Sequence, residues 1–100
     1  MVLRERNFRI HLLALALVIG AGIYFEITEN EWLVIFIISA VVLSLEMINS
    51  ALERLCDLFS PETNVAIGKI KDIAAGAVLI AALFAILIGI MIFWKYLFPL

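Results

Sequence analysis

The sequence predicts an all-α integral membrane protein with three transmembrane helices. Hydrophobic residues make up 66% of the 100 residues and charged residues only 16%, and the mean hydropathy of +1.19 is far above that of a soluble domain. The apolar residues also fall into three long runs. A hydrocarbon core about 30 Å thick needs roughly 20 helical residues per crossing. The chain is therefore expected to form a single membrane-embedded domain, residues 1–100, with three spans.

The three spans are expected at about residues 8–25, 32–59 and 73–94, and the third has no charge between Asp72 and Lys95. The acidic segment 26–31 is short enough to make the first two helices antiparallel. Ser60 and Pro61 predict the end of the second helix and a new start. Transmembrane strands are not expected, because they show short alternating segments rather than continuous apolar runs.

The basic residues predict the orientation. Six of the seven flank the start of the chain or the second connection: Arg4, Arg6, Arg9, Arg54, Lys69 and Lys71. Only Lys95 lies on the other side, so the N-terminus and the second connection are expected in the cytoplasm. Aromatic residues typical of a membrane interface are expected at the outer side: Tyr24, Trp32, Trp94 and Tyr96.

Several other readings can be set aside or left as alternatives. The net charge of −2 and the lack of a basic stripe with interleaved aromatics exclude nucleic acid as a partner. A cleavable signal peptide is an alternative for the first run, but its flank is mixed in charge and no small-x-small pattern precedes Glu26. The single Cys56 is expected to be a reduced packing residue.

Polar residues on the second helix predict a functional site. Glu46, Asn49 and Glu53 stand at positions i, i+3 and i+7, so they share one face. Carboxylates at membrane depth are costly and usually functional. Glu46 stands among apolar residues and suits a general base, with a purely structural carboxylate as the alternative. Asn49 alone would more often join helices, and Glu53 could equally be a helix-end acid paired with Arg54 or Lys71.

Further polar residues are expected at the cytoplasmic edge, where Glu5 precedes the first span and Lys71 and Asp72 precede the third. Carboxylate oxygens suit Mg²⁺, a lysine neutralises phosphate charge, and a base accepts a hydroxyl proton. The residues therefore indicate Mg²⁺-nucleotide chemistry. His11, the only histidine, has no second ligand at metal-binding spacing and is given no catalytic role.

Three strings carry a family resemblance: Glu5-Arg-Asn-Phe-Arg-Ile-His11, Glu46-Met-Ile-Asn-Ser-Ala-Leu-Glu53 and Lys71-Asp-Ile-Ala-Ala-Gly-Ala-Val-Leu79. The chain resembles the prokaryotic diacylglycerol kinase and undecaprenol kinase family over nearly its whole length. The first and last strings are more similar to the undecaprenol kinase branch. The resemblance implies a bacterial cell-membrane enzyme that transfers the γ-phosphate of ATP to the hydroxyl of a lipid alcohol, most simply undecaprenol.

The resemblance also implies residue roles. Glu46 corresponds to the catalytic base, and Glu5 and Glu53 to the Mg²⁺ ligands. The residues implied in ATP binding are Glu5, Asn49, Glu53, Glu62, Lys71 and Asp72. Phe8 and Arg9, together with Glu46, correspond to the lipid-binding residues. The implied assembly is a homotrimeric helical bundle with each active site shared between subunits.

Two features depart from the family pattern. Family members usually begin with an amphipathic surface helix, and only four residues precede Glu5 here, so that helix is expected to be missing. In the second connection Glu62-Thr-Asn64 replaces a Glu-Tyr-His string often found in the family.

The residues leave several questions open. Glycines and alanines on the first and third spans permit close helix approach and fit an oligomer, or are ordinary membrane composition: Gly20, Gly22, Ala74, Ala75, Gly76 and Ala77. The alternatives for function are a diacylglycerol kinase, a small proton-coupled transporter or channel, and a noncatalytic membrane subunit. The sequence does not decide between lipid alcohols.

Overall fold

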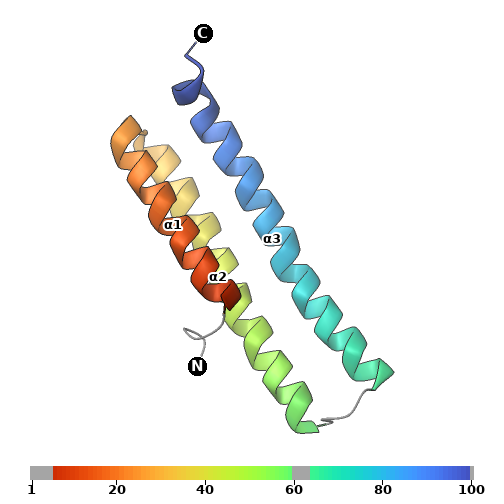
Figure 1. The fold of residues 1–100 in the computed structure, drawn as a ribbon. Coiled ribbons are helices and arrows are strands. Elements are labelled where there is room, and N and C mark those ends of the chain that lie inside the picture. Colours follow the sequence, from red (N-terminus) through yellow and green to blue (C-terminus); the bar gives the residue numbers. More distant parts are fainter. Residues whose placement is uncertain (1–5, 60–63, 100) are drawn as a thin grey trace.

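The computed structural model describes residues 6–59 and 64–99, which form three helices in an up-down-up arrangement (Figure 1). Helix α1 spans Arg6–Phe25, α2 spans Glu29–Phe59 and α3 spans Val65–Leu97. Each of the three is long and apolar enough to cross a membrane. The predicted all-α, three-span architecture of a multi-pass membrane protein is therefore confirmed.

Local hydrogen bonds define the tight turn between α1 and α2. Glu26 has a φ of 53° and ends α1, and the N–H of Ile27 donates to the carbonyl of Gly22 at 3.1 Å. These are the marks of a Schellman C-cap, although the left-handed position usually holds glycine. A capping box then starts α2: Thr28 N donates to Glu31 Oε1 at 2.9 Å, and Glu31 N donates to Thr28 Oγ1 at 3.2 Å. The turn therefore takes only three residues, 26–28.

Helix α3 begins earlier than the apolar run that predicts it. Asn64 is its N-cap, because its side-chain Oδ1 accepts from Ala66 N at 2.9 Å and from Ile67 N at 3.3 Å. The segment 65–72, expected to belong to the second connection, is therefore helical. As a consequence Lys71 and Asp72 lie on a helix and not in a loop.

The best-packed part of the molecule lies at the end of the bundle that contains the α1–α2 turn. Ile27, Ile35 and Ile92 are buried there, and partly buried neighbours surround them: Val18, Phe25, Trp32, Ile88, Phe93 and Tyr96. Trp32 and Tyr96, both expected at the outer membrane interface, therefore lie at the same end of the bundle.

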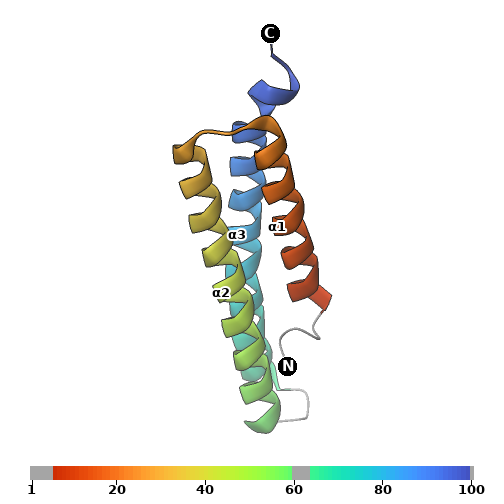
Figure 2. The same ribbon diagram turned by 90° about the vertical axis from the view of Figure 1, so that its left-hand side faces the viewer.

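The opposite end of the bundle is more open. Helices α2 and α3 pack extensively on each other, and both continue past the start of α1 (Figures 1 and 2). The start of α1, the end of α2 and the start of α3 lie toward this same end. No more than 22% of the most apolar stretch of any of the three helices is buried within the chain. Most of the apolar surface is thus available to lipid or to other helices.

Candidate functional site

The carboxylate of Glu46 is buried near the middle of α2. Only 4% of this residue is exposed, which is unusual for a glutamate. Its Oε1 lies 3.2 Å from Nε2 of His11 on α1, within hydrogen-bonding distance. The predicted catalytic base is therefore sheltered from solvent and has a specific partner on the neighbouring helix.

A polar row runs from Glu46 along the same face of α2 toward the open end of the bundle. Ser50, one turn further on, is also buried. Asn49 Nδ2 donates to Glu53 Oε1 at 3.2 Å. Asn49 Oδ1 is buried and has no hydrogen-bond donor near it within the described part of the chain. Such a group usually has a partner, so this acceptor is available to a ligand.

The row ends in an ion pair between α2 and α3. Lys71 Nζ lies 2.6 Å from Asp57 Oδ1, and Lys71 is also within electrostatic range of Glu53. The pair is partly exposed, so solvent weakens it and phosphate can compete for the lysine. Asp72, the other member of the predicted nucleotide-binding pair, is exposed beside it. The polar row is therefore defined by Glu46, Asn49, Ser50, Glu53, Asp57 and Lys71.

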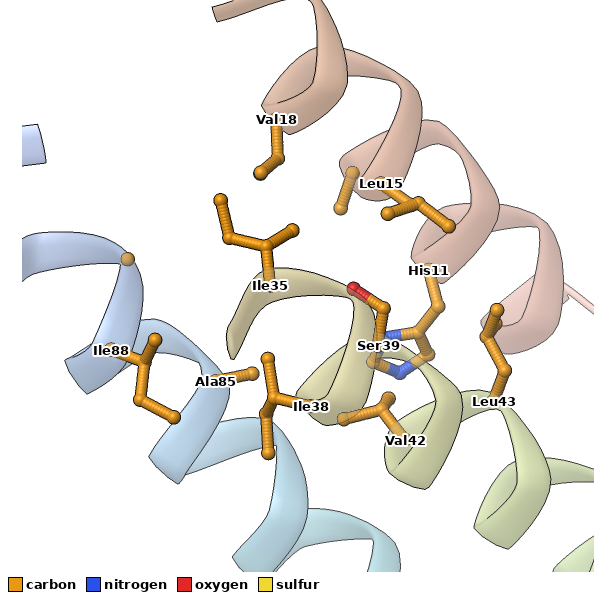
Figure 3. Close-up of a pocket in the computed structure, with 12 residues that line it drawn as sticks. His11, Leu15, Val18, Ile35, Ile38, Ser39, Val42, Leu43, Ala85 and Ile88 are labelled. Atoms are coloured by element: carbon orange, nitrogen blue, oxygen red, sulfur yellow. The ribbon is translucent and has the colours of Figure 1, made fainter. Parts of the chain in front are cut away.

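On the other side of Glu46, toward the middle of the bundle, the same face of α2 lines an apolar cavity of about 110 Å³ (Figure 3). His11 and Ser39 are its polar lining residues, and the apolar lining comes from all three helices: Ala14, Leu15, Val18, Ile35, Ile38, Val42, Leu43, Ala85, Ile88 and Gly89. Val42 lies one helical turn before Glu46. Glu46 does not line the cavity itself, but along α2 it stands between the lining residue Val42 and the polar row, and it contacts the lining residue His11.

The other predicted site residues are placed as follows. Phe8 is buried and Arg9 is exposed, both in the first turn of α1. Glu5 and Glu62 lie outside the described residues, so the structure does not place them. Within residues 6–59 and 64–99, no three His, Cys, Asp or Glu side chains gather to form a metal site. The described residues thus bring together Glu46, Asn49, Glu53 and Lys71, but they do not form a complete cation site.

Sequence reasoning assigned no site role to three members of this region: His11, Ser50 and Asp57. Asp57 received no role, although it stands four residues after Glu53 and eleven after Glu46, which places it on the same helical face. His11 was expected to have no catalytic role, and its contact with Glu46 joins residues 35 positions apart. The signal for Asp57 was periodicity. The only signal for His11 was its polarity within an apolar run.

Comparisons with known proteins show the family to which the chain belongs. The model of a family described as prokaryotic diacylglycerol kinase matches residues 1–93. The chain is 37% identical over 89 residues to an undecaprenol kinase from Bacillus subtilis. The matched residues cover 89% of this chain and 72% of that protein. It is 40% identical over 86 residues to a diacylglycerol kinase from Synechocystis, covering 85% of this chain and 49% of that protein. The chain thus spans about half the length of the Synechocystis relative.

Proposed function

The chain belongs to the prokaryotic diacylglycerol kinase family, and on that premise we propose that it is a membrane lipid kinase. It transfers the γ-phosphate of ATP to the hydroxyl of a lipid alcohol. The observation that carries the proposal is the position of Glu46, which is buried, follows the cavity-lining residues of α2, precedes the other members of the polar row and contacts the cavity-lining His11. A lipid hydroxyl and a nucleotide phosphate would meet at such a junction.

Glu46 is the proposed general base. The oxygen of the lipid hydroxyl attacks the γ-phosphorus and passes its proton to the Glu46 carboxylate. A new P–O bond to the lipid forms, and the bond between the γ-phosphorus and the bridging oxygen of ADP breaks. Phosphoryl transfer depends mainly on positioning and charge stabilisation. The burial of Glu46 supports this role, because a dry carboxylate is held in one place beside the reacting hydroxyl.

The donor chemistry of the polar row fits Mg²⁺. Glu53 supplies carboxylate oxygens and Asn49 a buried amide oxygen without a donor among the described residues, and Mg²⁺ is commonly held by one or two carboxylates together with substrate phosphates. We assign Glu53 and Glu5 as the protein ligands. When bound, Mg²⁺ neutralises charge on the transferring phosphate.

Lys71 and Asp72 are the proposed nucleotide-binding residues at the cytoplasmic end of α3, with Asn49, Glu53 and Glu62 as further contacts. The pairing of Lys71 with Asp57 supports this role, since it holds the ammonium group at the end of the polar row. A phosphate group carries more negative charge than one carboxylate and offers several acceptor oxygens. Nucleotide binding is therefore expected to draw Lys71 at least partly away from Asp57.

The apolar cavity is the proposed place for the part of the lipid next to its hydroxyl, with Phe8 and Arg9 at the entrance. Apolar cavities of roughly 150 Å³ accept a benzene ring, so about 110 Å³ accommodates a short branched segment. The similarity to the undecaprenol kinase of Bacillus subtilis, of which the chain covers 72%, is the reason to propose undecaprenol as the substrate of this chain. Diacylglycerol is the second candidate because of the Synechocystis relative.

We further propose that the protein works as a homotrimer in the bacterial cell membrane, with its N-terminus and second connection in the cytoplasm. The large apolar surface left exposed by a single chain supports an assembly, and the basic residues around the open end support the orientation. Native mass spectrometry of the protein released from detergent tests the assembly. A fully active monomer would rule out the trimer.

The test of the function is transfer of ³²P from γ-labelled Mg²⁺-ATP to lipid by the purified protein in nanodiscs. Undecaprenol and diacylglycerol are supplied separately at equal mole fraction, with protein-free nanodiscs as the control. We expect label in both lipids with a clear preference for undecaprenol. Equal or faster labelling of diacylglycerol removes the undecaprenol assignment but keeps the kinase. Labelling of neither lipid, in a folded protein that binds ATP, contradicts the proposed function.

A further inference from the structure

His11 is an unusual residue in its helix. It is the only polar side chain of α1 between Arg9 and Tyr24, and polar side chains at membrane depth need a partner or a function. Its Nε2 lies 3.2 Å from Glu46 Oε1. The imidazole also lines the apolar cavity, at the end nearer the start of α1 (Figure 3). His11 therefore contacts both the proposed base and the proposed lipid-binding cavity.

We propose that His11 is a positioning residue for Glu46, an inference that rests on the proposed lipid kinase function. An ionised carboxylate has no proton to donate, so a hydrogen bond at this distance requires the proton on His11 Nε2. The bond occupies Oε1 of Glu46, and the second oxygen is left to accept the proton of the lipid hydroxyl. His11 thereby holds the carboxylate in one rotamer.

Burial makes this contact effective. The side chains are 26% exposed for His11 and 6% for Glu46, so little water competes for the carboxylate oxygen that faces the imidazole. The two residues come from different helices, and α1 supplies no other polar side chain at this depth. Removal of the imidazole thus leaves Glu46 free to adopt other rotamers, which slows catalysis without removing the base.

Two matched substitutions test the role by kinetics. Glutamine carries its amide nitrogen at nearly the reach of histidine Nε2, whereas asparagine reaches only to the position of Nδ1. We expect His11→Asn to lower kcat by about 10- to 100-fold with KM values for ATP and lipid changed less than about threefold. We expect His11→Gln to restore most of that loss. Ser44→Ala, which changes an exposed polar residue of α2 outside the cavity and the polar row, should keep near-normal kcat.

The inference also has a readout that does not depend on activity. Because the chain has a single histidine, ¹⁵N NMR of histidine-labelled protein made without added histidines reports on His11 alone. Glu46→Gln should shift the Nε2 resonance, and Glu53→Gln, about two helical turns away, should leave it in place. An Nε2 resonance that does not respond to Glu46→Gln, or a normal kcat in His11→Asn, overturns the inference. Neither result bears on whether the wild-type protein phosphorylates lipid.

Discussion

Glu31, at the start of α2, binds Tyr96, at the end of α3: the Tyr96 hydroxyl donates to Glu31 Oε1 at 2.6 Å. The same carboxylate lies 2.7 Å from Lys95 Nζ through its Oε2 and closes the capping box with Thr28. One side chain therefore caps α2 and fixes it to α3. The contacts of Glu31 fix the relative position of α2 and α3. They do so at the end of the bundle opposite the polar row, which these two helices carry.

Removal of the Tyr96 hydroxyl should lower stability without affecting chemistry. Tyr96→Phe keeps the ring contacts with Phe25 and Phe93 but leaves Glu31 with one donor fewer. We expect a modest fall in Tm in detergent and normal kcat at low temperature. Tyr24→Phe is the matched control, since Tyr24 is largely exposed. An equal fall in Tm for both variants would show that the Glu31 contact contributes nothing specific.

Gly22 allows α1 to approach Trp32. A Cβ built at Gly22 would lie 2.6 Å from Trp32 Cη2 and 3.0 Å from Ile27 Cδ1, and the Trp32 ring stacks on Phe36, so it has little room to move. Gly22→Ala is expected to destabilise the protein by roughly 1–3 kcal/mol.

Gly20→Ala is the control for this experiment, because nothing lies within 4 Å of a Cβ at Gly20. In the absence of a partner helix, alanine there should be neutral or stabilising by up to about 1 kcal/mol. The measurement is thermal unfolding of both variants followed by circular dichroism. A loss of stability in Gly20→Ala instead would indicate that another helix packs on that face.

The left-handed backbone at Glu26 predicts a stabilising substitution. A side chain is disfavoured at a φ of 53°, and glycine is the usual residue at this position of a Schellman cap. Glu26→Gly should raise stability by up to about 1 kcal/mol with unchanged turnover, as measured by Tm and kcat together. A lower Tm would mean that the Glu26 side chain makes a contribution larger than the backbone strain.

Lys71 should matter for nucleotide affinity, whereas its neighbour Lys69 should not. Lys71 pairs with Asp57 at the end of the polar row, while Lys69 is exposed and two residues away on the helix. Lys71→Gln is expected to raise KM for ATP by roughly tenfold or more, and Lys69→Gln to change it by less than about twofold. Equal effects of the two substitutions would reduce the role of Lys71 to general surface charge.

The number and order of helices were predictable, because three apolar runs of membrane-spanning length leave few alternatives. The residues at which α2 and α3 start were harder to predict. Hydropathy predicts a start near Trp32, whereas the capping box of Thr28 and Glu31 starts the helix at Glu29. The Asn64 cap likewise extends α3 beyond its apolar run. Caps are local hydrogen bonds between polar residues, and hydropathy does not detect them.

Within the site, one helical face was predictable and contacts between helices were not. The periodicity of Glu46, Asn49 and Glu53 places them together on α2, and the structure agrees. The pairing of His11 with Glu46 depends on the relative depth and rotation of two helices. No spacing within one segment determines those quantities. Glu5 and Glu62 lie outside the described residues, so their roles stay predictions.

The most direct test of the account compares wild type with Glu46→Gln in single-turnover transfer of labelled γ-phosphate to undecaprenol, with ATP binding measured separately on the same samples. Glutamine keeps the shape of Glu46 and its hydrogen bonding but cannot accept the hydroxyl proton. The account predicts a rate lower by roughly 10²-fold or more with ATP affinity within about threefold of wild type. Transfer at the wild-type rate by Glu46→Gln would contradict the assignment of Glu46 as the base.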